Sequence, residues 1–226
     1  FAQSFANTVP FSEGIGFIQN IKTNNVDLPF YVTAHEVAHQ WWGHQVTEAG
    51  VKGNAMLSET LSQYSALMVM KQNFPPEIIK EFLKYELNSY LFGRTFEQKK
   101  EMPLYQVEGQ GYIHYRKGSL VMYALQDYIG EDSVNAALKR FVQDWGFKEA
   151  PYPTSKDLIS YYREVTPDSL QYIITDMFET ITLFENKTVD ATYEQQGEND
   201  YMVDLKVSSI KYRADSLGNE DSIPLK

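Results

Sequence analysis

The sequence predicts a mostly helical α+β protein, with a helical domain at residues 1–182 and the start of a small β-sandwich-like domain at residues 183–226. Apolar residues recur at helical spacing in most segments between residues 28 and 180. From about residue 182 the pattern alternates, and turn-forming residues separate the alternating segments 188–194 and 201–207. Two or three strands cannot bury a core alone, so we expect this second domain to be truncated.

The composition indicates a packed, acidic protein. Of its 226 residues 43% are hydrophobic and 14% aromatic, and the formal net charge is −10. Such a chain has no electrostatic footprint for nucleic acid or for an anionic membrane. It contains no cysteine, so a metal site would have to use histidine and carboxylate ligands.

The first segment, residues 1–18, is predicted to be an extended strand. Bulky residues alternate with small ones between Val9 and Ile18, which suggests a strand whose backbone is approached closely. The chain starts without methionine and shortly before the first helix described below. We therefore expect it to be part of a longer protein.

A helix over residues 28–45 carries the pattern His35-Glu36-Val37-Ala38-His39. Histidines four residues apart lie on one face of a helix, so both imidazoles can reach one Zn²⁺. In this pattern the glutamate is the general base that takes a proton from the attacking water. Asp27 is the expected N-cap and Gly43 the expected stop signal. A chance match on a buried helix is the alternative.

The third ligand distinguishes two classes of zinc hydrolase. The metzincin pattern needs a glycine and a histidine where this chain has Trp42 and Gln45. His44 lies one position before the one that the pattern requires for the third ligand, so we interpret it as a polar residue after the helix. The alternative is a carboxylate from the second helix, residues 55–73. Glu59 opens this amphipathic segment and is costly to bury unless it is paired or bound to a metal. An exposed glutamate in the first helical turn is the competing interpretation.

The rest of the first domain is predicted to be helical, with one long loop. Helices are expected near residues 76–92, 131–146, 154–165 and 168–180, with N-cap candidates at Asp132, Thr154 and Asp168. Residues 93–111 are polar and glycine-bearing, and we expect a loop over the cleft. In the second domain, a third strand should follow the turn at residues 215–219.

Two stretches together resemble a known family. His35 through Gly43, followed by Leu57-Ser58-Glu59, is similar to the zinc signature of the aminopeptidase N family of gluzincins. The resemblance implies a thermolysin-like catalytic domain with Zn²⁺ on His35, His39 and Glu59. Nineteen residues separate His39 from Glu59, one more than in the family pattern. The additional residue is expected in the loop at residues 48–54, whose glycines tolerate an insertion.

The same resemblance assigns two further residues. Glu13 aligns with the family glutamate that binds the free α-amine of the substrate, on an edge strand beside the zinc; a solvent-facing charge on that edge is the alternative. Tyr115-Arg116-Lys117-Gly118 matches a family motif whose tyrosine stabilises the oxyanion of the intermediate. For Tyr115 the alternative is simple packing, and for its neighbours Tyr112 and His114 packing is the preferred reading.

The expected function is zinc-dependent hydrolysis of peptides with a free N-terminus. A zinc endopeptidase is one alternative, and a zinc-stabilised domain that binds peptides or partner proteins with little turnover is another. Glu36 and Tyr115 argue against the second alternative, because a binding module needs neither. Several stretches also resemble a bacterial group in which such a domain follows an ABC-permease-like membrane region. That resemblance implies a parent protein embedded in a membrane, of which this chain is a soluble part.

Overall fold

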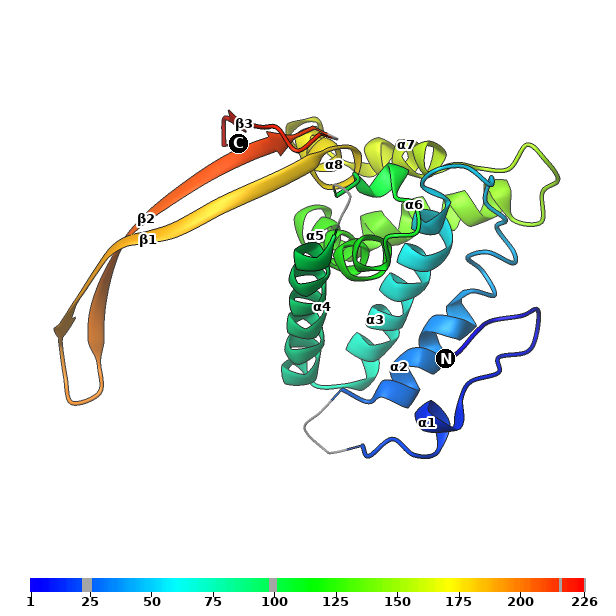
Figure 1. The fold of residues 1–226 in the computed structure, drawn as a ribbon, viewed down its shortest axis with the longest axis horizontal. Coiled ribbons are helices and arrows are strands. Elements are labelled where there is room, and N and C mark those ends of the chain that lie inside the picture. The colour runs from blue at the N-terminus through cyan, green and yellow to red at the C-terminus, as the bar shows by residue number, and fades with distance from the viewer. Residues whose placement is uncertain (22–25, 98–100, 216, 226) are drawn as a thin grey trace. The chain divides into compact units, whose positions relative to one another are not determined.

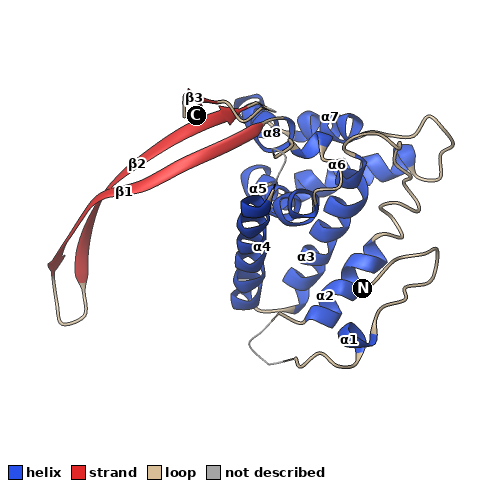
Figure 2. Ribbon diagram, viewed as in Figure 1, coloured by secondary structure: helices blue, strands red, loops and turns tan. Residues whose placement is uncertain are grey.

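A computed structural model describes residues 1–21, 26–97, 101–215 and 217–225. The chain forms two compact units, Phe1–Glu179 and Thr180–Lys226. The first unit is helical and the second is a three-stranded sheet (Figures 1 and 2). The helices of the first unit, in chain order, are α1 Glu13–Gly16, α2 Leu28–Ala38, α3 Leu61–Asn73, α4 Pro76–Phe96, α5 Gly118–Ile129, α6 Glu131–Trp145, α7 Ser155–Val165 and α8 Gln171–Ile174.

Two of these helices, α3 and α5, are each extended at the N-terminal end by a turn of π-helix. Met56–Thr60 leads directly into α3, and Tyr112–Lys117 leads directly into α5. A third π-helical turn, Thr175–Glu179, follows α8. The predicted helix at residues 55–73 is therefore confirmed as a continuous helical segment, and residues 112–129 form another. The first turn of each segment is wider than a turn of α-helix.

Helices α2 and α3, which carry the residues discussed below, pack side by side in the first unit (Figure 1). On α2 the buried positions include Tyr31, His35 and Ala38, which share one helical face. On α3 the residues Leu61, Tyr64 and Leu67 are almost fully buried. Asp27 caps α2 as predicted, because its carboxylate accepts a hydrogen bond from the Phe30 amide at 2.9 Å.

The predicted N-terminal strand is wrong. Residues 2 and 11, and residues 5 and 8, form only isolated antiparallel bridges around a tight turn. Asn7 in this turn adopts a φ of 61°, which bends the chain back on itself. The Ser12 carbonyl then accepts hydrogen bonds from the amides of Ile15 and Gly16, so residues 13–16 form the short helix α1 instead of continuing a strand.

The expected loop at residues 93–111 is only partly a loop. Helix α4 continues to Phe96, and Leu104 opens a short 3-10 helix, Leu104–Gln106. Leu104 and Val107 are completely buried in the main core, so this part of the segment packs into the unit. The prediction failed because polar residues surround these few apolar anchors. Residues 98–100 lie outside the described part.

Several helix ends differ from the expected ones. Thr154 caps α7 as predicted, in a capping box with Asp157. The N-cap of α6 is Gly130 and not Asp132, and Pro167 precedes the 3-10 turn in which Asp168 was the expected cap. Helix α2 ends at Ala38, well before the predicted end at residue 45, and the following turns reach the left-handed Gly43 with φ of 113°.

The second unit is an antiparallel sheet in the order β1-β2-β3. Its strands are β1 Ile181–Gln195, β2 Tyr201–Ala214 and β3 Glu220–Ile223, which follow the predicted strand, turn and strand pattern. The bulky side chains of Val203, Leu205 and Val207 on β2 are exposed. These described strands therefore do not enclose a core by themselves.

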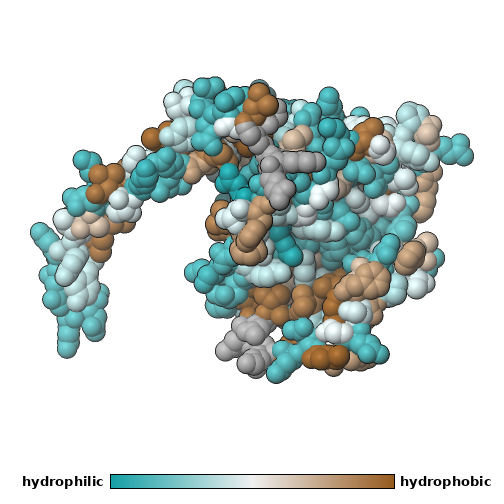
Figure 3. Space-filling model, viewed as in Figure 1, coloured by the Kyte–Doolittle hydropathy of each residue, from teal (hydrophilic) through white to brown (hydrophobic). Residues whose placement is uncertain are grey.

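Apolar side chains are also exposed on the first unit. In Figure 3 they gather, in brown, at the end of the unit where α1 and α2 lie. A groove there is lined by residues that include Phe30, Val37, Trp41 and Val69. Among the described residues, no helix is both long and apolar enough to cross a membrane.

Candidate metal centre

The two histidines of α2 face the same point. His35 lies within the helix and His39 is its C-cap residue, which keeps a helical backbone with φ of −61° and ψ of −17°. Their imidazole rings are 4.8 Å apart and nearly perpendicular, and the two Nε2 atoms are 3.2 Å apart. Although α2 is shorter than predicted, the spacing of four residues therefore has the expected effect.

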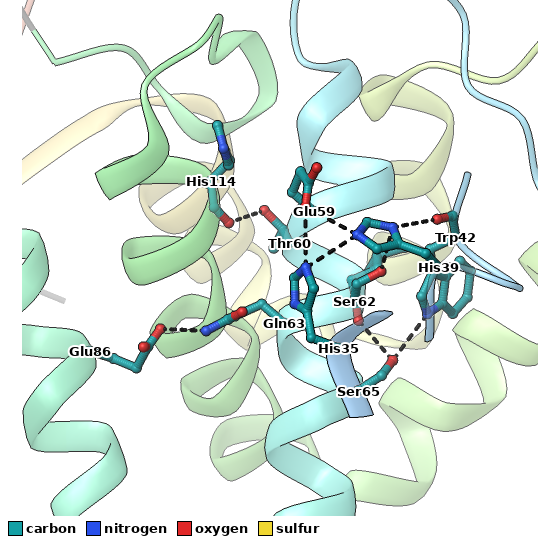
Figure 4. Close-up of polar contacts among 11 residues, drawn as sticks. His35, His39, Trp42, Glu59, Thr60, Ser62, Gln63, Ser65, Glu86 and His114 are labelled. Carbon is teal, nitrogen blue, oxygen red and sulfur yellow. Dashed lines mark hydrogen bonds and ion pairs between the residues drawn. The ribbon is translucent and has the colours of Figure 1, made fainter. Parts of the chain in front are cut away.

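Glu59 completes a triangle of ligand atoms (Figure 4). Its Oε2 lies 3.3 Å from Nε2 of His35 and 3.3 Å from Nε2 of His39. A tetrahedral Zn²⁺ with bonds of about 2.0–2.1 Å would hold its ligand atoms about 3.3 Å from one another. This Oε2 is buried and accepts no well-aligned hydrogen bond from the described residues. The three side chains therefore fit a zinc ion.

The carbonyl group of Trp42 fixes the tautomer of His39. Nδ1 of His39 lies 3.0 Å from the Trp42 carbonyl oxygen and 3.0 Å from Oγ of Ser62. A carbonyl oxygen can only accept, so Nδ1 carries the proton and Nε2 of the neutral ring presents its lone pair to the triangle. A carbonyl in this position orients a metal-binding histidine and increases its basicity.

The charges of the triangle reinforce one another in the metal-free protein. Burial by itself would lower the pKa of His39, but the Glu59 carboxylate and the Trp42 carbonyl outweigh burial and raise it above its usual value. Burial by itself would raise the pKa of Glu59, but the two histidines outweigh it and lower this pKa strongly. The metal-free site is therefore held together by a partly buried ion pair.

This ion pair predicts opposite pH dependences with and without zinc. In the metal-free protein the raised pKa of His39 gives stability that is fully present below the unfolded value of 6.5 and is lost as the pH rises through the folded value. Zinc needs the neutral imidazole, so stabilisation by zinc should grow over the same range. With a chelator present, we expect the melting temperature to fall as the pH rises above 6.5, and we expect the increase in melting temperature that zinc causes to grow over the same interval. His39→Gln should remove both pH dependences of the melting temperature. A metal-free wild-type protein whose melting temperature does not change over this pH range would contradict the ion pair.

The π-helical turn before α3 carries Glu59. A π turn holds one residue more than an α-helical turn, and such turns are frequent at functional sites. Glu59 is the fourth residue of the turn Met56–Thr60. This turn is therefore a second place, besides the loop at residues 48–54, that can accommodate the additional residue between His39 and Glu59.

One cavity of about 500 Å³ contains the triangle and the other predicted chemical groups. Glu36 and Tyr115 both line it, together with His35, His39 and Glu59. The Tyr115 ring lies 5.7 Å from the His35 ring. Burial and the negative charge of Glu59 raise the pKa of Tyr115 well above its usual value. The tyrosine is therefore a neutral hydrogen-bond donor at any working pH.

A close helix contact places Tyr115 over Glu59. Thr60, which follows the glutamate, donates a hydrogen bond of 2.6 Å to the carbonyl oxygen of His114 (Figure 4). A Cβ atom on Gly118 would lie only 2.6 Å from the Thr60 hydroxyl. Glycine at this position therefore allows the π turn of Tyr115 to approach the π turn of Glu59. This close approach explains why the motif that begins at Tyr115 ends in a glycine.

A buried polar cluster behind the metal centre was missed in the sequence. Glu86 of α4 is completely buried and accepts hydrogen bonds from Gln63 at 3.0 Å, Ser119 at 2.9 Å and Arg116 at 2.5 Å. The cluster connects α3, α4 and the segment of Tyr115, so it orients the helices that carry the site. Helical periodicity places Glu86 on the same face as Ile79 and Phe82, which is a signal for burial, but the sequence offers no signal for its three donors.

Glu13 does not lie in this cavity. It is an exposed residue at the start of α1, and the described lining of the cavity does not include it. The N-terminal segment instead lines the cavity with residues 1–4. Gln40 of the helix end donates hydrogen bonds to Oγ of Ser4 at 2.7 Å and to the Phe5 carbonyl at 2.9 Å, which holds this segment in place. The position of Glu13 therefore gives no support to its predicted role as an amine anchor.

The helical fold and the triangle of two histidines and one glutamate define a metallopeptidase domain of the type His-Glu-x-x-His. The chain belongs to peptidase family M1, because the model of the Peptidase family M1 domain matches residues 18–180. The resemblance to the aminopeptidase N family of gluzincins is thereby confirmed.

Two animal aminopeptidases are similar in sequence to part of this chain. The chain is 25% identical over 141 residues to human endoplasmic reticulum aminopeptidase 2 and 26% identical over 131 residues to putative aminopeptidase-2 of Caenorhabditis elegans. Each match covers 57% of this chain, but only 14% of the human relative and 7% of the nematode relative.

Solved structures of M1 zinc metallopeptidases share the fold. The enzyme from Deinococcus radiodurans aligns with a TM-score of 0.56 at 19% identity, and a variant of it with a bound Tyr-Ser-Ala substrate aligns with a TM-score of 0.57 at 17% identity. Both alignments cover 78% of this chain and 36% of the solved chain. At this level of identity the match supports the fold alone.

Proposed function

We propose that this chain provides the catalytic centre of a zinc-dependent peptidase of the aminopeptidase type. The observation that carries the proposal is the triangle of His35, His39 and Glu59, with edges of 3.2–3.3 Å, in one cavity with Glu36 and Tyr115. When bound there, Zn²⁺ polarises the carbonyl of the scissile bond and lowers the pKa of the attacking water.

Each remaining residue then has a defined task. Glu36 is 7% exposed and lines the cavity next to the first histidine, where its carboxylate accepts a proton from the attacking water and returns it to the leaving amine. The phenol of Tyr115 donates a hydrogen bond to the carbonyl oxygen as that oxygen gains negative charge. The Trp42 carbonyl keeps His39 in the tautomer that binds metal.

The proposed substrate is a peptide with a free N-terminus. The names of the two animal relatives describe aminopeptidases, and a solved M1 neighbour was obtained with a Tyr-Ser-Ala substrate. A cavity of about 500 Å³ is within the usual range for peptide-sized or smaller ligands. A zinc endopeptidase remains the second candidate, because Glu13 lies outside the described cavity lining. That the parent protein contains an ABC-permease-like membrane region remains a prediction from the resemblance.

Replacing Tyr115 by phenylalanine tests the proposed mechanism. The substitution removes only the hydroxyl, so zinc binding and folding should be unchanged. We expect kcat to fall by roughly 100-fold or more with little change in KM, because the hydrogen bond forms mainly in the transition state. The measurement is hydrolysis of aminoacyl-amide substrates by the zinc-loaded protein.

Tyr161→Phe is a matched control, since its hydroxyl donates to Asp144 away from the described cavity. An unchanged kcat in the Tyr115 variant would remove this residue from the mechanism. Absence of zinc-dependent hydrolysis of any peptide by the wild-type protein would contradict the proposed function itself.

A further inference from the structure

The cavity that contains the metal triangle has one carboxylate without a task. Besides the phenol of Tyr115, its ionisable lining side chains are His35, Glu36, His39, His44, Glu48 and Glu59. The triangle uses three of them and the general base is a fourth. His44 is an exposed imidazole, so Glu48 is the one remaining carboxylate in the described lining.

Glu48 is held in position but is not paired. Its Oε2 is buried and has no hydrogen-bond partner among the described residues. The neighbouring Ala49 amide donates to the Pro153 carbonyl at 2.9 Å, and Val46 on the other side is 1% exposed. The backbone on both sides of the glutamate is therefore anchored, so a segment of fixed position presents the carboxylate to the cavity.

The charge balance of the cavity favours a cation opposite Glu48. No lysine or arginine occurs in its described lining, and Lys52, which lies close in sequence, is paired with Glu108 at 3.3 Å. The α-ammonium of Phe1, a residue of the lining, donates a hydrogen bond to Oγ of Ser12 at 3.4 Å. A partly buried carboxylate without a donor is costly, and a positively charged nitrogen relieves that cost by a charge-assisted hydrogen bond. A substrate that enters the cavity can supply this nitrogen.

We propose that Glu48 is a specificity-determining residue that binds a positively charged nitrogen of the substrate. The inference rests on the proposed function and adds the substrate class. Two parts of a peptide offer this chemistry, namely the free α-amine and the side chain of arginine or lysine. The sequence comparison assigned this role to Glu13, but Glu13 lies on α1 and is not part of the described cavity lining. Glu48 is the residue of the lining that can bind the cation instead.

A set of four substrates distinguishes the two sources of charge. Peptides that start with arginine or with its neutral analogue citrulline are each prepared with a free and with an acetylated N-terminus, and kcat/KM is measured for the wild-type protein and for Glu48→Gln. Loss of the paired charge should lower kcat/KM by about 10-fold or more for substrates with the nitrogen that Glu48 binds. Acetylation should erase this effect if the nitrogen is the α-amine, and citrulline should erase it if the nitrogen belongs to the side chain.

The control variant is Glu108→Gln, which removes one negative charge from an exposed side chain that does not line the described cavity. It should leave all four values unchanged. The proposal is overturned if Glu48→Gln changes none of the four values, or lowers all four equally.

A binding measurement separates this proposal from the proposed function. Calorimetry with the same four peptides, on the zinc-loaded Glu36→Gln protein with and without Glu48→Gln, needs no turnover. We expect binding to weaken by about 10-fold only for the peptides that carry the nitrogen to which Glu48 binds. If the wild-type protein hydrolyses no peptide, the proposed function fails, while this difference in binding still decides the role of Glu48.

Discussion

Replacing Glu59 by glutamine should lower the zinc content from about one ion per chain to a small fraction of that. The neutral amide keeps the size of the side chain but removes the charged oxygen that completes the triangle with His35 and His39. Replacing residues that merely support a ligand costs about 10–100-fold in metal affinity, so loss of the ligand itself should cost more than about 100-fold. The measurement is metal analysis after dialysis, followed by competition with a chelator of known affinity.

The same experiment distinguishes Glu59 from other acidic residues. Glu101→Gln is too disruptive as a control, because Glu101 pairs with Lys117 and Arg94. Glu131→Gln is suitable, since its only described ion pair is an exposed one with Lys71. Full zinc occupancy in the Glu59 variant would show that the third ligand lies elsewhere.

Glu36→Gln should have the second large effect, a loss of about 100-fold to 10,000-fold in kcat with zinc still bound. The amide cannot accept the proton from the attacking water, but it occupies the same volume next to His35. Zinc content and melting temperature should therefore remain close to those of the wild-type protein. The measurement is the steady-state rate of peptide hydrolysis together with metal analysis of the same sample.

This variant also tests the alternative of a binding module. A domain that only holds peptides would bind them equally well with glutamine at position 36 and would show no turnover to lose. A Glu36→Gln protein with wild-type activity would assign the general base to another residue.

The helices of the first unit were largely predictable from the sequence, because their apolar residues recur with helical period and because caps such as Asp27 and Thr154 act locally. The N-terminal strand was not predictable in the same way. Its alternation of bulky and small residues fits a strand, but the left-handed Asn7 and the contacts of Gln40 with residues 4 and 5 bend this segment. Those contacts join positions far apart in sequence.

The metal triangle follows from motif spacing, since His35 and His39 share a helix face and Glu59 opens the adjacent helix. The contacts of the groups that surround the triangle do not follow from the motif. The roles of the Trp42 carbonyl and of Ser62 depend on where the chain turns after α2, and the cluster of Glu86 depends on how α4 packs. Glu48 is informative only once its buried oxygen and the cavity are seen together.

The π-helical turn of Glu59 affects how ligand spacing can be used in pattern searches. A helix that widens by one residue at its first turn absorbs an insertion without moving its later residues. The number of residues between the second histidine and the glutamate is then not a fixed property of this kind of centre. A search with the rigid family spacing would end on Ser58, which also lines the cavity but has no carboxylate. Patterns that allow one additional residue in this interval would recover chains of this type.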